Sequence, residues 1–219
     1  MCVNFTPATP TSIQRMTGLH APEYRPETYP GYAAPIIRAV DVDAANVTLR
    51  VDAALFGLIP GWAKDRSFGK RTYNARSETV AEKPSYRTAW RQRRFCLVPM
   101  EQFFEPCWAT GRAVRWSIHR KDGTPFAVAG IWESWTDRSS GEIVESFSML
   151  TINADGHAVM GRFHRPGDER RSLVVVPADN WHTWLSATTT HAASMFNAMD
   201  DSAFAAEAAP TKQAQAELL

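Results

Sequence analysis

The sequence predicts mostly antiparallel β structure accompanied by a few short helices. Apolar and polar residues alternate with the period of two that a half-buried strand shows. The alternation is clearest in three runs: VRWSIHR, PFAVAGIWESW and IVESFSMLTIN. The polar sequences KDG and DRSSGE separate these runs, and the KDG sequence is typical of a hairpin turn, which joins antiparallel strands.

Further apolar runs extend the predicted β structure, and each ends at a proline, a glycine or a polar turn. They are IIRAV and VTLRVDAALFGLI within residues 36–59, FCLVP at residues 95–99, and LVVVP at residues 173–177. Helices are predicted where apolar residues recur with helical spacing, and they are short. They cover residues 11–17, 83–94, 178–186 and 189–199.

The composition is that of an ordinary globular domain. Of the 219 residues, 44% are hydrophobic and 21% are charged, which is enough apolar material for a substantial core. We expect a single domain over residues 2–200. Residues 201–219 are alanine-rich, polar and aperiodic, so we expect a disordered C-terminal tail.

The absence of certain patterns narrows the class of protein. No apolar run approaches the ~20 residues that a membrane-spanning helix needs, and the first residues lack the pattern of a secretory signal. We therefore expect a soluble, cytoplasmic protein with no membrane partner. Cys2, Cys96 and Cys107 have no CxxC spacing, so we expect neither a disulfide framework nor a metal site, and no cofactor.

A basic and aromatic stretch covers residues 62–94. It holds ten lysines and arginines and five aromatic residues, but only three acids. Basic side chains bind phosphates and aromatic rings stack on unpaired bases, so the stretch favours contact with single-stranded nucleic acid. The alternative is a solvated helix over residues 83–94 with a basic face.

Cys2 is the first candidate reactive residue. An initiator methionine is removed efficiently when the second residue is small, and removal would leave Cys2 with a free α-amine beside its thiol. The reference pKa values are about 8 for the amine and about 8.5 for the thiol, so both groups react near neutrality. Together they can close a five-membered thiazolidine ring on an aldehyde, which an internal cysteine cannot do.

Other candidates are a carboxylate and two histidines. Glu105 lies between Phe104 and Pro106, and apolar surroundings raise the pKa of a carboxyl group and suit it to proton transfer. A glutamate facing water at a strand end is the alternative. His157 and His164 lie in a polar, glycine-containing loop rich in arginine, and the pattern does not choose between them.

Five sequence blocks occur in order: MC at residues 1–2, GLIPGW at 57–62, NARSET at 74–79, FFE at 103–105 and FH at 163–164. Together they resemble the SOS-response-associated peptidase (SRAP) family, whose members cross-link covalently to abasic sites in single-stranded DNA. The resemblance extends from Cys2 to about Leu185. It implies an α+β fold of curved, mostly antiparallel sheets that approach a barrel, with helices around it.

The resemblance also implies catalytic roles. Cys2 would form the thiazolidine cross-link after removal of Met1. Glu105 would move protons at the amine and help to remove Met1 autocatalytically. His164 would promote opening of the abasic sugar, and Asn74 would hold the adduct.

A second set of residues is implied to bind DNA. Arg76 would grip a flanking phosphate, with Arg71 as a further basic contact, and Trp62 and Pro35 would stack against bases beside the lesion. The implied partner is single-stranded DNA that contains abasic sites. We expect a monomer that is associated with the nucleoid.

The sequence departs from the family pattern in places. Val3-Asn4 replaces the usual Gly-Arg, so a basic contact near Cys2 is missing or supplied from elsewhere. The block around His164 is also altered, which keeps His157 as the alternative. Two rival functions are a cysteine peptidase acting on other proteins and a module that binds single-stranded DNA without covalent chemistry.

Overall fold

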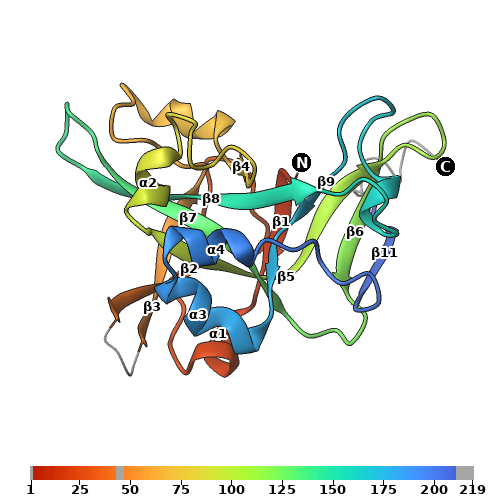
Figure 1. Ribbon diagram of the computed structural model, residues 1–219, viewed down its shortest axis with the longest axis horizontal. Helices are drawn as coiled ribbons and strands as arrows, with labels where there is room; N and C mark the ends of the chain where they lie inside the picture. The colour runs from red at the N-terminus through yellow and green to blue at the C-terminus, as the bar shows by residue number, and fades with distance from the viewer. Residues whose placement is uncertain (1, 43–46, 211–219) are drawn as a thin grey trace.

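The structure is a computed structural model that describes residues 2–42 and 47–210. Its centre is a closed barrel in which five strands pair in the order β7, β8, β3, β2 and β5, and β5 pairs back with β7 (Figure 1). These strands are β2 (Ala33–Val42), β3 (Val47–Phe56), β5 (Phe95–Cys107), β7 (Phe126–Thr136) and β8 (Ile143–Asn153). Four of the five pairings are antiparallel, and β3 pairs with β8 in parallel.

Shorter strands add to the barrel at its edges. The strands β1 and β6 pair with β5, β11 pairs with β6, β4 and β9 pair with β8, and β10 pairs with β7. Their bounds are β1 (Asn4–Pro7), β4 (Asn74–Arg76), β6 (Val114–Arg120), β9 (Arg171–Leu173), β10 (Val175–Val176) and β11 (Phe204–Ala208). The predicted α+β fold with mostly antiparallel, barrel-like sheets is confirmed.

The helices are short and lie around the barrel (Figure 1). They are α1 (Pro10–Thr17), α2 (Arg87–Arg91), α3 (Trp181–Ser186) and α4 (Thr189–Ser194), with 3-10 turns η1 (Arg66–Arg71), η2 (Met160–Arg162) and η3 (Ala178–Asn180). The first helix matches its prediction because local signals fix both ends. The hydroxyl of Thr9 caps its N-terminus, and Gly18 ends it with a φ of 74°.

Aromatic side chains fill the barrel and tie the N-terminal strand to it. Phe56 of β3 stacks on Phe147 of β8, with ring centroids 5.3 Å apart, and Phe5 of β1 meets the edge of Phe56 at 5.3 Å. All three rings are fully buried. Because burial of one such ring contributes about 1.5–3 kcal/mol, Phe5 holds the segment after Cys2 firmly against β5.

The GLIPGW block forms a turn that requires glycine. Gly57 has a φ of 118°, and a Cβ atom there would lie 2.1 Å from the carbonyl oxygen of Gly69 in η1. The reverse also holds, since a Cβ atom on Gly69 would lie 2.5 Å from the carbonyl oxygen of Gly57. Two backbone segments therefore touch at this point, which positions Trp62 on the loop that follows.

The prediction of a disordered tail from residue 201 is wrong for Phe204–Ala208. These residues form β11 and cover the free edge of β6, with Phe204 paired to Arg120 and Ala208 to Trp116. Phe204 is buried and its ring meets Phe126 at 4.9 Å. An uncovered strand edge is unfavourable in a soluble protein, and an alanine-rich strand gives little alternation from which to predict it. Residues 211–219 lie outside the described residues.

Three other features bear on the sequence-based expectations. Within the described residues, no helix combines the length and the apolar character needed to cross a membrane. Cys2, Cys96 and Cys107 are buried free thiols. The predicted helix over residues 83–94 is shorter than expected, because only Arg87–Arg91 is α-helical before β5 begins at Phe95.

Candidate active site

Cys2 lies buried where three segments distant in sequence meet. Its side chain is 1% exposed, and its Sγ donates to the carbonyl oxygen of Asn4 at 3.4 Å. The pairing of β1 with β5 sets Asn4 opposite Phe104, which brings Cys2 towards Glu105. From β4, the side chain of Asn74 donates through Nδ2 to the carbonyl oxygen of Cys2 at 2.7 Å.

The carboxyl group of Glu105 is buried beside this cysteine. Burial raises its pKa above the ordinary value, as the apolar neighbours in the sequence predict. The pKa of the Cys2 thiol is also raised, first by burial and then by the charge of Glu105. Both groups therefore favour their protonated, neutral forms more than they would in water.

His164 is held against Glu105 by an unusual backbone conformation. Its Nε2 lies 4.0 Å from Oε2 of Glu105. Its φ is 78°, and its backbone N–H donates to the carbonyl oxygen of Pro106 at 3.3 Å. A left-handed residue other than glycine costs energy that the surrounding structure must supply, and such residues cluster at functional sites. Burial lowers the pKa of this imidazole to about 4, so it is neutral at pH 7.

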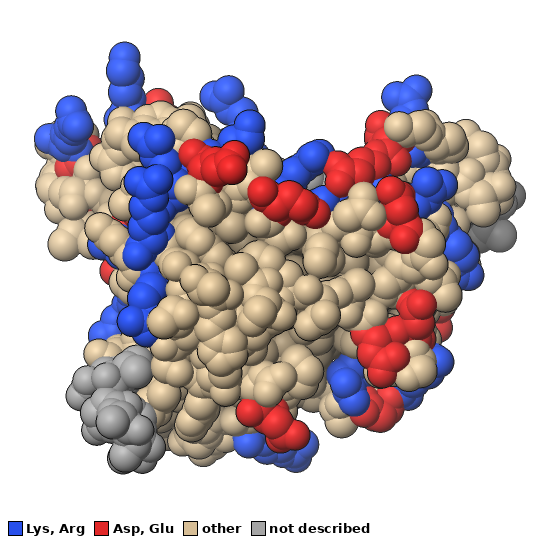
Figure 2. All heavy atoms as spheres, viewed as in Figure 1, with Lys and Arg blue, Asp and Glu red and all other residues tan. Residues whose placement is uncertain are grey.

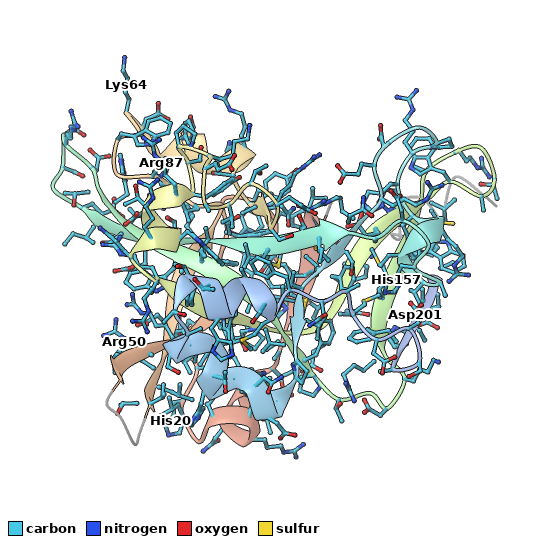
Figure 3. The ribbon with its side chains drawn as sticks, in the orientation of Figure 1. His20, Arg50, Lys64, Arg87, His157 and Asp201 are labelled. Atoms are coloured by element: carbon cyan, nitrogen blue, oxygen red, sulfur yellow. The ribbon has the colours of Figure 1, made fainter. Side chains whose placement is uncertain are left out.

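The alternative histidine, His157, has a structural role. Its Nε2 lies 2.8 Å from the carbonyl oxygen of Met199, and its Nδ1 accepts from the backbone N–H of Met160 at 3.1 Å. Figure 3 shows it beside Asp201 at the end of the molecule that carries β6 and β11. The geometry therefore favours His164 over His157 as the histidine of the site.

Two tyrosines that sequence reasoning did not assign to the site lie at it, and one of them bonds to Asn74. The hydroxyl of Tyr86 donates to the backbone carbonyl of Asn74 at 2.9 Å. Tyr73 directly precedes Asn74 in the chain. Burial raises the pKa of its hydroxyl, and the nearby groups of Cys2 and Glu105 raise it further. Within the described part of the chain, Oδ1 of Asn74 is buried without a hydrogen-bond partner, so it can accept a donor from a bound molecule.

The DNA-binding candidates lie at different depths. Trp62 is 51% exposed, its ring meets Phe68 at 4.8 Å, and Arg71 is exposed in η1. The exposed guanidinium of Arg76 forms an ion pair with Glu169 at 2.8 Å. Pro35 does not fit its predicted stacking role, because it is buried in β2 opposite Ala53.

The N-terminal strand lies below a hollow in the surface. Figure 2 shows this hollow at the upper edge of the molecule, between two lobes that carry both basic and acidic side chains. Figure 1 marks the N-terminus beneath it, between β4 and β9. Lys64 and Arg87 lie on the left lobe, and Lys64 extends away from the body of the protein (Figure 3).

The replacement of the family's Gly-Arg by Val3-Asn4 has a structural counterpart. Asn4 is buried, and its Oδ1 accepts from the guanidinium of Arg115 in β6 at 2.8 Å. Arg115 also pairs with Glu27 at 2.6 Å and covers the ring of Phe104. Asn4, which replaces the family's arginine, is therefore itself bonded to an arginine that β6 supplies.

An ion-pair network around one buried arginine supports β4, and only the structure reveals it. Arg171 of β9 is 2% exposed and donates to both carboxylate oxygens of Glu78, at 2.9 and 2.8 Å. Arg171 also pairs with Glu169 at 2.7 Å, and Glu169 pairs with Arg76. The last residues of the NARSET block thus anchor the strand that presents Asn74.

Comparison with known proteins identifies the family. The family model described as "SOS response associated peptidase (SRAP)" matches residues 1–214. The chain belongs to the SRAP family. Among curated SRAP-like relatives, the abasic site processing protein YobE of Bacillus subtilis (strain 168) is 30% identical over 168 residues, which is 75% of this chain and 72% of YobE. The abasic site processing protein YoaM of the same organism is 29% identical over 171 residues, covering 77% and 69% of the two chains.

Solved structures show the same SRAP fold. A crystal structure of a protein from Bordetella bronchiseptica superposes with a TM-score of 0.85 at 27% identity, covering 96% of this chain and all of the other. A second, from Bacteroides thetaiotaomicron, has a TM-score of 0.79 at 22% identity, covering 94% and 91%. The second likeness concerns the fold alone.

The side chains at the candidate site determine which chemistry it can support. Among the described residues of this SRAP chain, no three His, Cys, Asp or Glu side chains lie close enough together to hold a metal ion. The site combines a buried thiol, a buried carboxyl group with a raised pKa, a neutral imidazole and an amide. This set is suited to moving protons at a carbonyl oxygen or an amine nitrogen.

Proposed function

We propose that this protein captures abasic sites in single-stranded DNA by forming a covalent thiazolidine between Cys2 and the lesion. The observation that carries the proposal is the meeting of Asn74, Glu105 and His164 around Cys2. The relatives named abasic site processing proteins support the choice of substrate. Met1 is removed first, and Glu105 assists this autocatalytic cleavage.

The reaction uses the amine before the thiol. The α-amine of Cys2 attacks the aldehyde of the ring-opened abasic sugar, and water leaves to give an imine. Glu105 takes a proton from the attacking amine and returns one to the departing hydroxyl, which its raised pKa suits it to do. The Cys2 sulfur then bonds to the imine carbon while the thiol proton passes to the nitrogen, which closes the ring.

His164 and Asn74 prepare the sugar and hold it. A neutral imidazole at pH 7 can either accept or donate a proton at the sugar oxygen, and so promote the open, aldehyde form. Oδ1 of Asn74, which has no hydrogen-bond partner among the described residues, accepts a hydrogen bond from a sugar hydroxyl. The same side chain fixes the backbone of Cys2 through Nδ2.

A cysteine peptidase is the weaker candidate. Catalytic cysteines of peptidases have a lowered pKa that maintains a thiolate, whereas burial and Glu105 raise the pKa of the Cys2 thiol. That environment suits a mechanism in which the amine attacks first. We further propose that the chain acts as a cytoplasmic, nucleoid-associated monomer.

Denaturing gel electrophoresis tests the proposal. Protein with a free Cys2 amine is mixed with a single-stranded oligonucleotide that contains one abasic site. We expect a heat-stable adduct, and we expect an N-terminal extension before Cys2 to abolish it. A native protein that forms no adduct, or an extended protein that forms it equally well, contradicts the proposal.

A further inference from the structure

A cavity lies directly beside the catalytic residues. It has a volume of about 360 Å³, and His164 forms part of its wall. Two tryptophans also line it, Trp108 just after the end of β5 and Trp116 in β6. In the pairing of these strands Trp116 stands opposite Glu105, and its ring meets Phe163, the neighbour of His164, at 6.0 Å. The cavity therefore includes one proton-transfer group, His164, in its wall, and Trp116 connects it to the other, Glu105.

The indole rings of this cavity are available for contact with a ligand. Both tryptophans are half-buried, so part of each ring is accessible. Among the described residues, Nε1–H of Trp108 is buried without a hydrogen-bond acceptor. A buried donor without an acceptor costs about 1–3 kcal/mol, and a ligand with a carbonyl or phosphate oxygen would remove that cost.

Arginines surround these two rings. The guanidinium of Arg162 lies 5.5 Å from the ring centre of Trp116, and that of Arg165 lies 6.0 Å from the ring centre of Trp108. Within the described residues neither arginine forms an ion pair, and both are exposed. Arg170 also lines the cavity, held by its Nε, which donates to the carbonyl oxygen of Gly161 at 2.6 Å.

The chemistry of this cavity matches a nucleotide. Indole rings provide stacking surfaces for a base, and the guanidinium groups provide charge for a phosphate. The N–H of Trp108, which has no acceptor among the described residues, provides a donor for a sugar or phosphate oxygen. An aliphatic ligand would leave the donor unpaired, and a free anion would not use the rings. We propose that this cavity holds the nucleotide next to the abasic site, with its base against Trp108 and its phosphate near Arg162. This inference rests on the proposed function and adds a specificity subsite to it.

Non-covalent binding provides the test, because it is independent of the cross-linking chemistry. The probe is a fluorescein-labelled single-stranded oligonucleotide with a tetrahydrofuran analogue at the lesion, which has no aldehyde. In two further probes a second tetrahydrofuran removes only the base on the 5′ side or only the base on the 3′ side. Fluorescence anisotropy gives Kd for each probe.

With the native chain, Kd should rise at least about fivefold for one of the two base-lacking probes, the lower end of what one stacked base contributes. Trp108→Ala should bind the complete probe more weakly and lose nothing further when that base is removed. Trp108→Phe keeps a ring but lacks the N–H, so it should retain part of the dependence. Because this second variant keeps the aromatic packing, it guards against misfolding of the first.

Arg162→Gln and Arg50→Gln form a matched pair that each remove one positive charge. Arg50 lies at the opposite side of the molecule from β6 (Figure 3), so Arg50→Gln measures the effect of losing one positive charge away from the cavity. Arg162→Gln should weaken binding more than Arg50→Gln does. Equal Kd values of the native chain for all three probes would overturn the proposal. So would a Trp108→Ala variant with the same dependence on the base as the native chain. Adduct formation on an aldehyde-containing oligonucleotide reports separately on the proposed function.

Discussion

At the scale of single residues, Cys2 combines two reactive groups whose contributions can be separated by substitution. The α-amine belongs to the backbone and is kept by any small residue at position 2 that still allows removal of Met1. The thiol is removed by one substitution. Because Cys2 is buried and bonded through its carbonyl oxygen to Asn74, a smaller side chain leaves the amine in place.

Cys2→Ala should therefore form an imine with the abasic sugar but no ring. We expect no heat-stable adduct, an adduct that borohydride traps, and some cleavage of the strand by β-elimination at the lesion. A denaturing gel with and without borohydride measures all three. The native chain is the control. A heat-stable adduct of Cys2→Ala would show that the thiol is not part of the link.

Glu105 should control the pH dependence of capture. If it acts as a base, the rate increases with pH as this carboxyl group ionises, and its raised pKa moves that increase above the ordinary range of a glutamate near 4.5. Single-turnover rates at saturating DNA should show this limb in the native chain and lose it in Glu105→Gln. His164, already neutral above a pKa of about 4, should add no step between pH 6 and 8.

The stability of Glu105→Gln provides an independent check. A carboxyl group whose pKa is higher in the folded state destabilises the fold as pH rises above the unfolded value of about 4.5. Removing the charge should therefore make the variant more stable than the native chain at pH 7, with the difference disappearing near pH 4. The opposite result would be a Glu105→Gln variant that loses stability relative to the native chain as the pH rises from 4 to 7. That result would contradict a raised pKa for Glu105.

Arg76 and Glu169 should have opposite effects on DNA affinity. Arg76 is paired with Glu169 in the free protein, so a DNA phosphate must compete with a carboxylate for the same guanidinium. Arg76→Ala should weaken binding of a tetrahydrofuran-containing single strand several-fold, while Glu169→Gln should strengthen it. Anisotropy titrations at two salt concentrations measure both. Weaker binding by Glu169→Gln would show that the pair acts as a structural unit.

At the scale of secondary-structure elements, glycines and ion pairs hold the segments that present the site. The contact of Gly57 with Gly69 joins the loop after β3 to η1, and the Arg171–Glu78 pair joins β9 to the turn after β4. Both lie outside the catalytic centre. They explain why the GLIPGW and NARSET blocks contain residues that have no chemical role in the reaction.

Gly57→Ala should destabilise the protein by about 3 kcal/mol or more, because it adds a Cβ in a left-handed conformation and against backbone. Gly61→Ala is the matched control in the same block. A Cβ on Gly61 meets no atom within 4 Å, so the change in stability should stay within about 1 kcal/mol. Urea unfolding of the two variants measures the difference. Equal stabilities would show that η1 moves away without cost.

At the scale of the whole molecule, the site lies under a hollow between two lobes rather than on a flat surface (Figure 2). Trp62 and Arg71 belong to the basic and aromatic stretch of residues 62–94, which also contains Lys64 and Arg87 of the left lobe. The ion pairs of Arg76, Glu169 and Arg171 connect β4 to β9. An abasic sugar has to leave the strand and reach the buried Cys2. A continuous duplex resists that movement because stacking and pairing hold its backbone.

The protein should therefore cross-link a single-stranded abasic oligonucleotide at least about tenfold faster than the same strand in an intact duplex. Trp62→Ala should slow capture on the single strand, because its exposed ring can stack only on accessible bases. Rates at subsaturating protein, measured at one salt concentration, test this. Equal rates on single strand and duplex would mean that the hollow admits duplex DNA.

The sequence by itself determined the local features. Alternation predicted β6, β7 and β8, a threonine cap and a glycine fixed α1, and apolar neighbours predicted the raised pKa of Glu105. Each depends on residues within a few positions of one another, so a linear pattern contains it. The ordered blocks also led to the correct family and to the set of residues that surround Cys2.

The tertiary structure decided what depends on residues far apart in the chain. Closure of the barrel between β5 and β7, the parallel pairing of β3 with β8, and the covering of β6 by β11 leave no periodic trace in any one segment. The burial of Pro35, the distance between His164 and Glu105, and the supply of Arg115 to Asn4 follow from those pairings. Packing energy is shared among distant side chains, and therefore only the folded chain determines which of them meet.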